Sequence, residues 1–513
     1  MMTKFDPAHR FTADAVRSVE DKPTAAATKV DLSPLAHQIA SQYRRDTMSP
    51  VMVSGIMRLL EFALLMASGA VLYAWYVGPQ VASPWLYAGM ISAASIVTVL
   101  GLELTDRYQI AALRRPLGSL TSIVVVWGGV LALMTLAGFF LKISAEFSRL
   151  WLGAWFLAGL ALMLGPRLIL SRLIRRWARN GAMERRAVIV GGGQAAEALI
   201  RSIEREPYND IRICGIFDDR DNRRSPPLVA GYPKLGNVDE LIEFARIARI
   251  DMLIVSLPLT AESRVLSMLK KLWVLPVDIR LSAHAGQLRF RPRSYSYIGS
   301  VPMLDIFDRP INDWDSVAKR AFDIAFSLLG IIALSPIMLA TAIAIKLDSK
   351  GPVLFRQKRH GFNNEEIEVF KFRSMYVDQN DAAARKLVTK GDPRVTRVGR
   401  FIRKSSIDEL PQFFNALKGD LSLVGPRPHA AAAAAENGLY HEVVDGYFAR
   451  HRVKPGVTGW AQINGWRGET DTDEKIRMRT EFDIYYIENW SLWLDLKILL
   501  LTPIRLLNTE NAY

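Results

Sequence analysis

Long apolar stretches separated by short polar segments dominate the first third of the chain. Four of them, each long enough to cross a bilayer as a helix, cover residues 59–77, 84–102, 117–141 and 150–170. Residues 78–83, between the first two, carry no charge, whereas arginines follow the second stretch and crowd behind the fourth. Because Lys and Arg are enriched in cytoplasmic loops, this pattern predicts four transmembrane helices within residues 51–178. The N-terminus and everything after the fourth helix are then expected in the cytoplasm.

Polar positions near these apolar stretches predict two further features. Arg58 and Glu61 lie near the start of the first stretch, where we expect their long side chains to reach the membrane interface. Residues 1–50 are polar and Ala-rich, so we predict a largely disordered cytoplasmic segment without a cleaved signal peptide. Within it, Ser33 and Pro34 are suited to begin a short basic amphipathic helix that ends near Arg45.

Composition and charge agree with a membrane protein. The chain of 513 residues is 50% hydrophobic and has a formal net charge of +14, as expected where basic surfaces face anionic lipid. No nucleic-acid-binding module accompanies the charge, so nucleic acid is not an expected partner. The single cysteine, Cys214, excludes internal disulfides and agrees with a reducing compartment.

Residues 185–300 alternate between apolar strands and helices, which predicts a Rossmann-like parallel α/β domain. The expected strands cover residues 187–190, 211–217 and 251–257, and an expected helix covers residues 238–247. Gly191, Gly193 and Ala196 match the G-x-G-x-x-A pattern of a nucleotide-binding turn, with Asp218 or Asp219 placed to hold a ribose. The alternative, which we favour, is a tight turn that only allows close packing of helix and strand.

A fifth apolar run, from Ala321 to Ile345, opens the last third of the chain. Ser335 and Pro336 lie in its middle, where a proline removes a backbone donor and interrupts a helix. Basic residues flank both ends, with Lys319 and Arg320 before the run and Lys346 after it. Positive charge on both sides predicts a re-entrant helix-break-helix over residues 319–346 that enters and leaves by the cytoplasmic face.

Adjacent carboxylates at Asp408 and Glu409 are the strongest catalytic candidates. They follow a dense series of cations, namely Arg394, Arg397, Arg400, Arg403 and Lys404. Cations of this kind bind phosphate oxygens, one carboxylate can bind a divalent cation, and the other can attack phosphorus. An exposed charged turn is the alternative interpretation of these residues taken alone.

Several ordered motifs resemble the bacterial sugar transferase family, the phosphoglycosyl transferases that act on polyprenol phosphate. The resemblance is carried by residues 351–355 (GPVLF), 371–375 (KFRSM), the acidic pair, 424–428 (VGPRP) and 454–462 (KPGVTGWAQ). It extends over essentially the whole chain from about Met57 and is greatest to the undecaprenyl-phosphate glucose or galactose phosphotransferases of exopolysaccharide synthesis. It implies an α+β catalytic domain over residues 315–513.

The resemblance also implies a reaction. A sugar 1-phosphate, glucose 1-phosphate in the first place and galactose 1-phosphate as the alternative, passes from a UDP-sugar to undecaprenyl phosphate with release of UMP. Asp408 is the implied nucleophile, forming an aspartyl-phosphosugar, and Glu409 is the implied ligand of Mg²⁺. The first membrane step of exopolysaccharide or capsule synthesis in the bacterial inner membrane is the implied role.

Other positions receive roles from the same resemblance. Lys371, Arg373, Arg403 and Arg427 are implied to bind substrate phosphate, and Trp460 and Gln462 to lie near the nucleotide. Arg320 is an implied anchor for the lipid headgroup, and Ser335 with Pro336 forms the helix break. From the residues alone, Lys371 is equally compatible with a surface strand, and Trp460 and Gln462 with a structural loop.

The C-terminal part of the chain suggests supporting features. Asp471, Asp473 and Glu474, with residues 482–489, are expected to shape the substrate side of the site, and residues 490–507 to form an interfacial amphipathic helix. Residues 430–435 are an alanine run with high helix propensity, where relatives often carry more varied side chains, so polar contacts from these positions are not expected. A homodimer is the expected oligomer. The alternatives are a nucleotide-sugar oxidoreductase or epimerase, which lacks a Tyr-x-x-x-Lys base, and a non-catalytic assembly or sensor protein.

Overall fold

A computed structural model of the chain divides into two compact units, residues 46–184 and residues 1–45 together with 185–513. The structure describes residues 15–16, 31–43, 48–78, 84–181, 183–205, 211–220, 225–258, 261–282, 295–298, 301–377, 392–429, 434–435, 438–440, 444, 447–466 and 472–507. Of residues 1–50, which were predicted to be largely disordered, residues 1–14, 17–30 and 44–47 lie outside the described residues.

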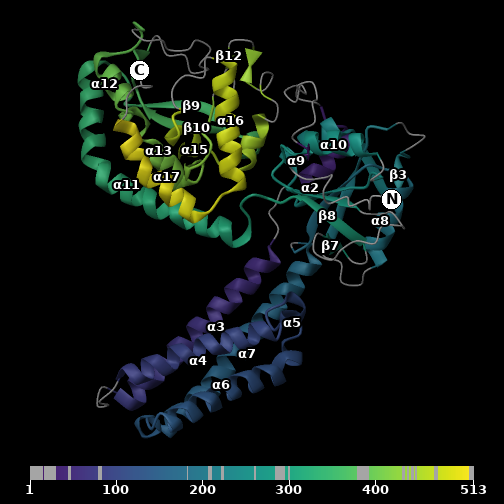
Figure 1. Ribbon diagram of the computed structural model, residues 1–513, viewed down its shortest axis with the longest axis vertical. Coiled ribbons are helices and arrows are strands. Elements are labelled where there is room, and N and C mark those ends of the chain that lie inside the picture. The colour runs from purple at the N-terminus through teal and green to yellow at the C-terminus, as the bar shows by residue number, and fades with distance from the viewer. Residues whose placement is uncertain are drawn as a thin grey trace, which may run out of the picture. The chain divides into compact units, whose positions relative to one another are not determined.

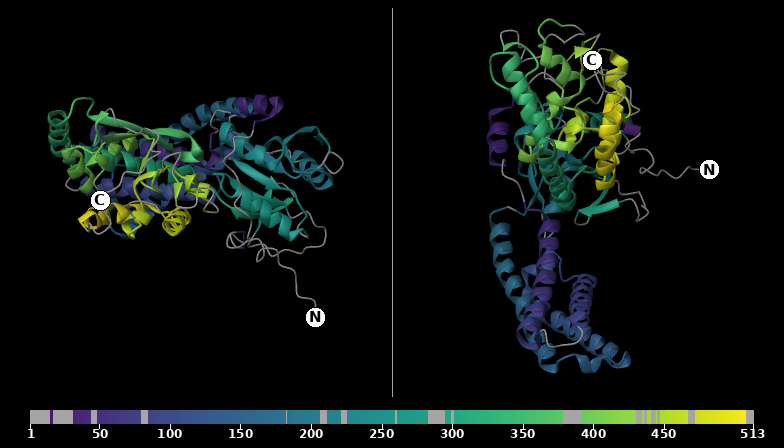
Figure 2. Two further views of the ribbon diagram at one scale, coloured as in Figure 1. Left: turned by 90° about the horizontal axis from the view of Figure 1, so that it is seen from above. Right: turned by 90° about the vertical axis from the view of Figure 1, so that its left-hand side faces the viewer.

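The unit of residues 46–184 is a helical bundle. Its elements are α3 (Pro50–Leu72), a π-helical extension (Tyr73–Val77), α4 (Pro84–Leu104), α5 (Ile110–Arg114), α6 (Leu120–Phe140) and α7 (Arg149–Arg179). The helix α3 packs on α4 and α7, and α6 packs on the same two helices, which closes a four-helix bundle (Figures 1 and 2). All four apolar stretches predicted from the sequence form helices long and apolar enough to span a membrane.

Tryptophans fill the core of the bundle. Trp127, Trp151 and Trp155 are fully buried, and each indole N–H donates to a backbone carbonyl oxygen, at 3.0–3.2 Å. A Cβ atom at Gly69 would lie 2.9 Å from Ile91 and 3.0 Å from Trp155, so only glycine allows this approach. The indoles satisfy their own donors and bring the helices close together.

A buried ion pair joins α3 to α7. Arg167 donates to both carboxylate oxygens of Glu61, at 2.5 and 2.9 Å, and the Tyr108 hydroxyl donates to the same carboxylate at 2.6 Å. The expectation that Glu61 reaches the interface is therefore wrong, because its side chain is fully buried and paired. Arg58 is partly exposed and pairs with Glu103 at 2.7 Å.

The α/β domain contains an eight-stranded sheet in the order β3-β4-β2-β1-β5-β6-β8-β7. The five strands from β4 to β6 are parallel, and β3, β7 and β8 are antiparallel to their neighbours. The elements are β1 (Arg185–Val190), α8 (Gln194–Arg205), β2 (Ile211–Phe217), β3 (Leu228–Val229), β4 (Tyr232–Gly236), α9 (Val238–Ile247), β5 (Met252–Val255), α10 (Glu262–Leu272), β6 (Asp278–Ser282), β7 (Tyr295–Ile298) and β8 (Val301–Phe307). The predicted parallel core is confirmed, and the sheet extends a few residues past position 300.

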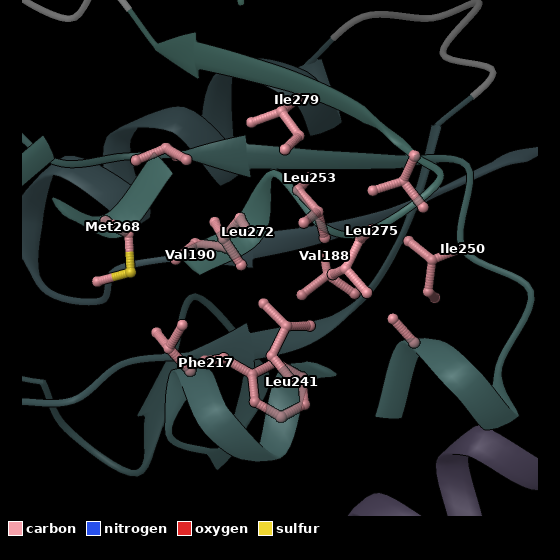
Figure 3. Close-up of a cluster of buried hydrophobic side chains, with 14 of the residues drawn as sticks. Val188, Val190, Phe217, Leu241, Ile250, Leu253, Met268, Leu272, Leu275 and Ile279 are labelled. Atoms are coloured by element: carbon pink, nitrogen blue, oxygen red, sulfur yellow. The ribbon is translucent and has the colours of Figure 1, made fainter. Parts of the chain in front are cut away.

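Both faces of the sheet are buried, as parallel sheets require. Val188 and Val190 of β1 point into one hydrophobic cluster with Leu241 of α9 and Leu272 of α10 (Figure 3). The alternate residues of β1 contribute to a second cluster, which α8 covers. Such strands appear in the sequence as predominantly apolar runs, which explains why β1, β2 and β5 were predictable.

The helix α2 (Pro34–Gln42) packs on α9 and β4 of this domain. The Ser33 hydroxyl accepts from the amide of Ala36 at 3.2 Å, and Pro34 occupies the first turn, so the predicted start of the helix is confirmed. The carbonyl oxygen of Tyr43 accepts from Arg186 at 2.8 Å. This part of the N-terminal segment is therefore ordered on the domain.

The remaining residues form the predicted α+β domain. Its elements are α11 (Asp313–Asp348), β9 (Leu354–His360), β10 (Glu366–Phe372), α12 (Arg397–Lys404), α13 (Gln412–Lys418), β11 (Ser422–Val424), β12 (Ala434–Ala435), β13 (Gly438–Leu439), β14 (Gly456–Thr458), α15 (Trp460–Ile463), α16 (Asp473–Glu488) and α17 (Leu492–Leu507), with 3₁₀ turns at Phe362–Asn364, Ile407–Glu409 and Tyr447–Arg452. The C-terminal helix predicted for residues 490–507 is confirmed as α17. Residues 430–433 of the alanine run lie outside the described residues, and Ala434 and Ala435 form a strand.

The long helix α11 is continuous through Pro336, so the predicted interruption of the helix is not found. A proline at this position cannot donate to the carbonyl oxygen of Ile332, and the Ser335 hydroxyl donates to that oxygen instead, at 2.8 Å. Figure 1 shows that α11 bends. Its first half packs on the cluster of Leu423 and its last turn on Phe372, so both halves contact one compact domain.

Candidate active site

The acidic pair lies on a single 3₁₀ turn between two helices. The preceding helix, α12, begins at Thr396, whose hydroxyl accepts from the amide of Gly399 at 2.9 Å. After this helix Ser406 adopts a left-handed conformation (φ 57°), which reverses the chain and ends the helix. Pro411 then leads into α13. The two adjacent carboxylates are thus held on a short, conformationally defined turn.

Glu409 is held by two cations. Arg427 donates from both terminal nitrogens, at 2.5 Å to Oε1 and 3.0 Å to Oε2, and Lys371 Nζ donates to Oε1 at 2.9 Å. Burial alone would raise the pKa of Glu409, but the charges of Arg427 and Lys371 hold it well below its usual value. Glu409 is therefore ionised at neutral pH with both oxygens engaged.

Asp408 has a different environment from its neighbour. Among the described residues, its carboxylate accepts no hydrogen bond and forms no ion pair. Burial, reinforced by the charge of Glu409, raises the pKa of Asp408 to about 6, although Lys371, Arg403 and Arg427 act in the opposite direction. The predicted cation Arg403 is thus close enough to act on Asp408. The pair combines a fixed carboxylate with an unbonded one.

The strand β10 carries Lys371, and an asparagine fixes that strand. The side chain of Asn415, on α13, accepts from the amide of Phe370 at 2.8 Å and donates to the carbonyl oxygen of Glu368 at 2.7 Å. Asn415 is fully buried, so both bonds are shielded from water. Since α13 directly follows the acidic turn, this contact sets the position of Lys371 relative to Glu409.

Arg427 belongs to a loop that crosses a second loop at close range. The strands β11 and β14 pair in parallel, and the amide of Gly456 donates to the carbonyl oxygen of Pro426 at 2.8 Å. A Cβ atom at Gly459 would lie 2.3 Å from the carbonyl oxygen of Gly425. The glycines of both predicted motifs are therefore required by backbone contact, which holds the Arg427 loop in place.

A buried polar cluster supports the Arg427 loop from behind. Arg450 donates to the carbonyl oxygen of Arg427 at 2.8 Å and forms an ion pair with Asp483. His429 lies against Tyr447, with its Nδ1 2.8 Å from the hydroxyl, and against Arg450. Burial, and then the charge of Arg450, lowers the pKa of His429 well below its usual value, so the imidazole is neutral. No single motif in the sequence indicated this cluster.

Two of the predicted basic residues lie away from the acidic pair and cap helices. Arg373 is buried and donates to the carbonyl oxygens of Ser349 and Lys350 at the end of α11, both at 2.7 Å. Arg320 donates to the carbonyl oxygens of Ala416 and Leu417, both at 2.6 Å, at the end of α13. Each guanidinium satisfies terminal carbonyl groups of a helix. Their substrate and lipid contacts stay predictions.

Trp460 and Gln462, which were predicted to lie near the nucleotide, belong to α15, directly after Gly459. Trp460 stacks on Tyr485, with ring centroids 5.9 Å apart, and packs in the cluster beside Ile487. Gln462 Oε1 is buried and has no hydrogen-bond partner among the described residues. Asp473 and Glu474 lie in the first turn of α16, whereas Asp471 lies outside the described residues. Nucleotide binding by Trp460 and Gln462 stays a prediction.

The glycine-rich turn of the α/β domain is occupied by side chains of the chain itself. Gly191 and Gly193 have positive φ angles, as the predicted tight turn requires. Between them, the amide of Gly192 donates to the buried carboxylate of Asp218 at 2.6 Å, and Arg220 donates to the carbonyl oxygen of Gly192 at 2.6 Å. Arg220 and the Gly192 amide lower the pKa of Asp218 despite its burial. The Gly192 amide of the glycine-rich turn is thus already bonded to a carboxylate of the chain itself.

The acidic pair offers a donor set that fits magnesium only with help from a substrate. Within the described part of the chain, no group of three acidic, histidine or cysteine side chains is placed to hold a metal ion. Mg²⁺ commonly binds through one or two carboxylates together with substrate phosphates and water. Glu409, whose Oε2 accepts a single hydrogen bond, would supply a hard oxygen ligand of this kind, and substrate phosphates and water would complete the site.

Comparison with known proteins places the chain in a family. Residues 314–509 match the bacterial sugar transferase family, and residues 103–283 match a CoA-binding domain. The chain is 34% identical over 461 residues to a UDP-glucose:undecaprenyl-phosphate glucose-1-phosphate transferase of Xanthomonas campestris pv. campestris, covering 89% of this chain and 94% of the relative. Transferases of the same name from Escherichia coli and Klebsiella pneumoniae are 38% and 40% identical, covering 71% and 70% of this chain and 76% of each relative. The chain therefore belongs to the bacterial sugar transferase family.

Proposed function

We propose that the chain transfers a hexose 1-phosphate, glucose 1-phosphate in the first place, from a UDP-sugar to undecaprenyl phosphate and releases UMP. The three relatives described above carry names that specify UDP-glucose and undecaprenyl phosphate. UDP-galactose is the alternative donor. This reaction would be the first membrane step of exopolysaccharide or capsule synthesis.

The observation that carries the proposal is the asymmetry of the acidic pair. Glu409 has both oxygens held by Lys371 and Arg427, so it is a poor nucleophile. Asp408 is partly buried and has no hydrogen-bonding cation among the described residues, and an anion left unbonded in this way is reactive. Asp408 is therefore the nucleophile and Glu409 the fixed partner.

The reaction proceeds in two displacements at one phosphorus atom. An oxygen of Asp408 attacks the phosphorus that bears the sugar, the bond to the bridging oxygen breaks, and UMP leaves with that oxygen. A phosphate oxygen of the lipid then attacks the same phosphorus and releases the Asp408 carboxylate. The product is a lipid diphosphate sugar, and two bulky substrates use one site in turn.

Charge neutralisation at the site comes from the cations around the acidic pair. Lys371 and Arg427 are positioned to stabilise the negative charge that accumulates on phosphate oxygens during each displacement. Glu409 would hold Mg²⁺ together with the substrate phosphates, and the ion would supply further positive charge. Because Arg427 and Lys371 already bind Glu409, they also keep that carboxylate oriented for this role.

We further propose that α11 is re-entrant and that the catalytic domain faces the cytoplasm. A straight helix of 36 residues would be about 54 Å long, enough to cross a bilayer completely. Lys319 near its start contacts Asp495, and Asp348 at its end accepts from the amide of Val398, so both ends are tied to one domain. A single crossing would separate those ends. Labelling of cysteines introduced near Lys319 and Lys350 from one side only supports re-entry, and labelling from opposite sides contradicts it.

The other parts of the chain are proposed to support this reaction. The four-helix bundle anchors the enzyme in the bacterial inner membrane, and the α/β domain serves as a scaffold rather than a nucleotide site. Homodimerisation is the expected assembly. Chemical crosslinking in membranes would report the oligomeric state.

Product analysis tests the proposal directly. Purified protein in detergent is incubated with undecaprenyl phosphate, magnesium and a panel of UDP-sugars, and the nucleotide product is identified. UMP release supports phosphosugar transfer, whereas UDP release indicates a glycosyltransferase and a change in nicotinamide absorbance indicates an oxidoreductase. Without lipid, mass spectrometry should find a hexose phosphate attached to Asp408. A peptide containing Asp408 that stays unmodified while UMP forms would contradict the covalent intermediate.

A further inference from the structure

The cations on the two faces of the β9–β10 hairpin have different kinds of partner. Side chains directly opposite each other share a face, so Arg356 and Lys358 lie on one face and Arg359 lies on the face that carries Lys371. On the first face, exposed Arg356 pairs with Glu368 at 3.6 Å and exposed Lys358 pairs with Glu366 at 3.2 Å. The face toward the acidic pair lacks this local compensation for Arg359.

Arg359 contacts only neutral acceptors among the described residues. Its Nε and Nη2 donate to Oε1 of Gln357, at 3.1 and 2.7 Å, and its Nη1 donates to the carbonyl oxygen of Pro428. Gln357 is itself buried, so it fixes the guanidinium from one side. The contact with Pro428 places Arg359 beside Arg427, which donates to both oxygens of Glu409.

The charges around Arg359 are those of the acidic site. Burial, and next the nearby charge of Arg427, lowers the pKa of Arg359 to about 10, while Glu409 and Asp408 act in the opposite direction. Arg359 therefore keeps its charge at neutral pH in surroundings that disfavour it. A fixed, partly buried cation without a carboxylate partner is suited to receive an anion from outside the chain.

We propose that Arg359 is a further substrate-binding residue that holds a phosphate group at the acidic site. Its position on β9 lies four residues from the residue opposite Lys371, about 13 Å along the strand. Arg359 and Lys371 thus lie at opposite ends of the face from which Glu409 and Arg427 are reached. A guanidinium matches two phosphate oxygens at once, as an ammonium does not.

This inference rests on the proposed function, in which two substrates bring phosphate. One source is the diphosphate of the nucleotide sugar, and the other is the phosphate monoester of the lipid. In the full-length enzyme, Arg359→Gln and Arg359→Lys are compared with Lys358→Gln, a matched change on the exposed face of the same strand. KM is measured for the UDP-sugar and for undecaprenyl phosphate, together with inhibition by UMP.

We expect Arg359→Gln to raise one KM about 10- to 100-fold, the range for loss of a charged hydrogen bond. A raised KM for the UDP-sugar with weaker UMP inhibition assigns the nucleotide phosphate. A raised KM for the lipid alone assigns the lipid phosphate. Arg359→Lys should retain part of the affinity, and Lys358→Gln should stay within about twofold of the wild type.

The proposal fails if Arg359→Gln is folded and leaves both KM values and UMP inhibition unchanged. If that variant does not fold, Arg359→Lys decides the question through thermal unfolding with and without UMP or a short-chain polyprenyl phosphate. Loss of the stabilisation that either ligand gives the wild type supports the proposal, and full retention of both overturns it. Absence of UMP release from the wild type would instead reject the proposed function.

Discussion

Two aspartates, buried Asp218 in the α/β domain and partly buried Asp408 in the catalytic domain, both lie near arginines but differ in what they bond. Asp218 accepts from the Gly192 amide and from Arg220, which lowers its pKa. Asp408 is desolvated without such bonds among the described residues, and its pKa rises to about 6. The Asp218 carboxylate is hydrogen-bonded within the chain and stabilises a turn, whereas the Asp408 carboxylate stays available to a substrate. The two carboxylates differ in hydrogen bonding and in exposure, not in residue type.

The strongest test of this comparison removes the available carboxylate. We expect Asp408→Asn and Glu409→Gln each to reduce UMP release by on the order of 10³-fold or more, because nucleophile and fixed partner act as one unit. Asp420→Asn is a matched control, since Asp420 lies on a nearby turn and pairs with exposed Lys418. Near wild-type turnover in either active-site variant would show that the assigned pair is wrong.

The raised pKa of Asp408 predicts a pH dependence. The carboxylate must be ionised to attack, so the rate should fall about tenfold per pH unit as the pH drops below about 6. The measurement is UMP release in a single turnover without lipid, because a lipid phosphate monoester itself titrates near pH 6. A rate that stays constant down to pH 4.5 would mean that Asp408 has an ordinary pKa.

Removing the Asp218 carboxylate should lower the stability of the α/β domain and leave catalysis nearly unchanged. Asp218→Asn loses charged hydrogen bonds to the Gly192 amide and Arg220, so we expect the α/β domain to lose about 1–3 kcal/mol of unfolding free energy. Asp239→Asn, at an exposed pair with Lys271, should cost well under about 1 kcal/mol. Thermal unfolding measures both, and turnover of the folded enzyme should change less than about twofold. A large loss of turnover in a folded Asp218→Asn variant would give the domain a catalytic role.

The smallest expected effect is that of added nucleotides on the α/β domain. Since Asp218 already accepts from the Gly192 amide, NAD, NADP and CoA should leave the unfolding temperature and turnover unchanged. Saturable stabilisation by any of them, abolished by Gly193→Val, would show that Asp218 yields its position to a phosphate.

Local patterns predicted the elements that depend on neighbouring residues. The strand Ile211–Phe217 and the helix Val238–Ile247 have the predicted bounds, because a mostly apolar run, interrupted by exposed Arg212, and an Asn237 cap with acidic first-turn residues define them locally. The acidic pair was predictable because its residues are adjacent in the chain. Contacts between residues that are distant in the chain were not predictable, since the sequence does not show which strand or loop a side chain meets.

The missed parts of the site are of this distant kind. Asn415 contacts β10 across 45 positions, and Arg450 reaches Asp483 across 33. The contact of Arg373 with the carbonyl oxygen of Ser349, 24 positions away, was likewise not predictable, and its substrate binding stays a prediction. The proposed phosphate-binding role of Arg359 was not predictable, because it depends on the face of the hairpin on which Arg359 lies.

The bond between Ser335 and Ile332 has a consequence for the bend of α11. In hydrocarbon, a carbonyl oxygen that a proline leaves without a donor has no water to turn to and costs several kcal/mol. The hydroxyl of Ser335, the residue before the proline, donates to this carbonyl oxygen, so water is not needed to satisfy it. No other element has to supply that donor, although α11 also packs on α13. A serine directly before a proline therefore lets the helix continue through the proline without an unbonded carbonyl at this turn.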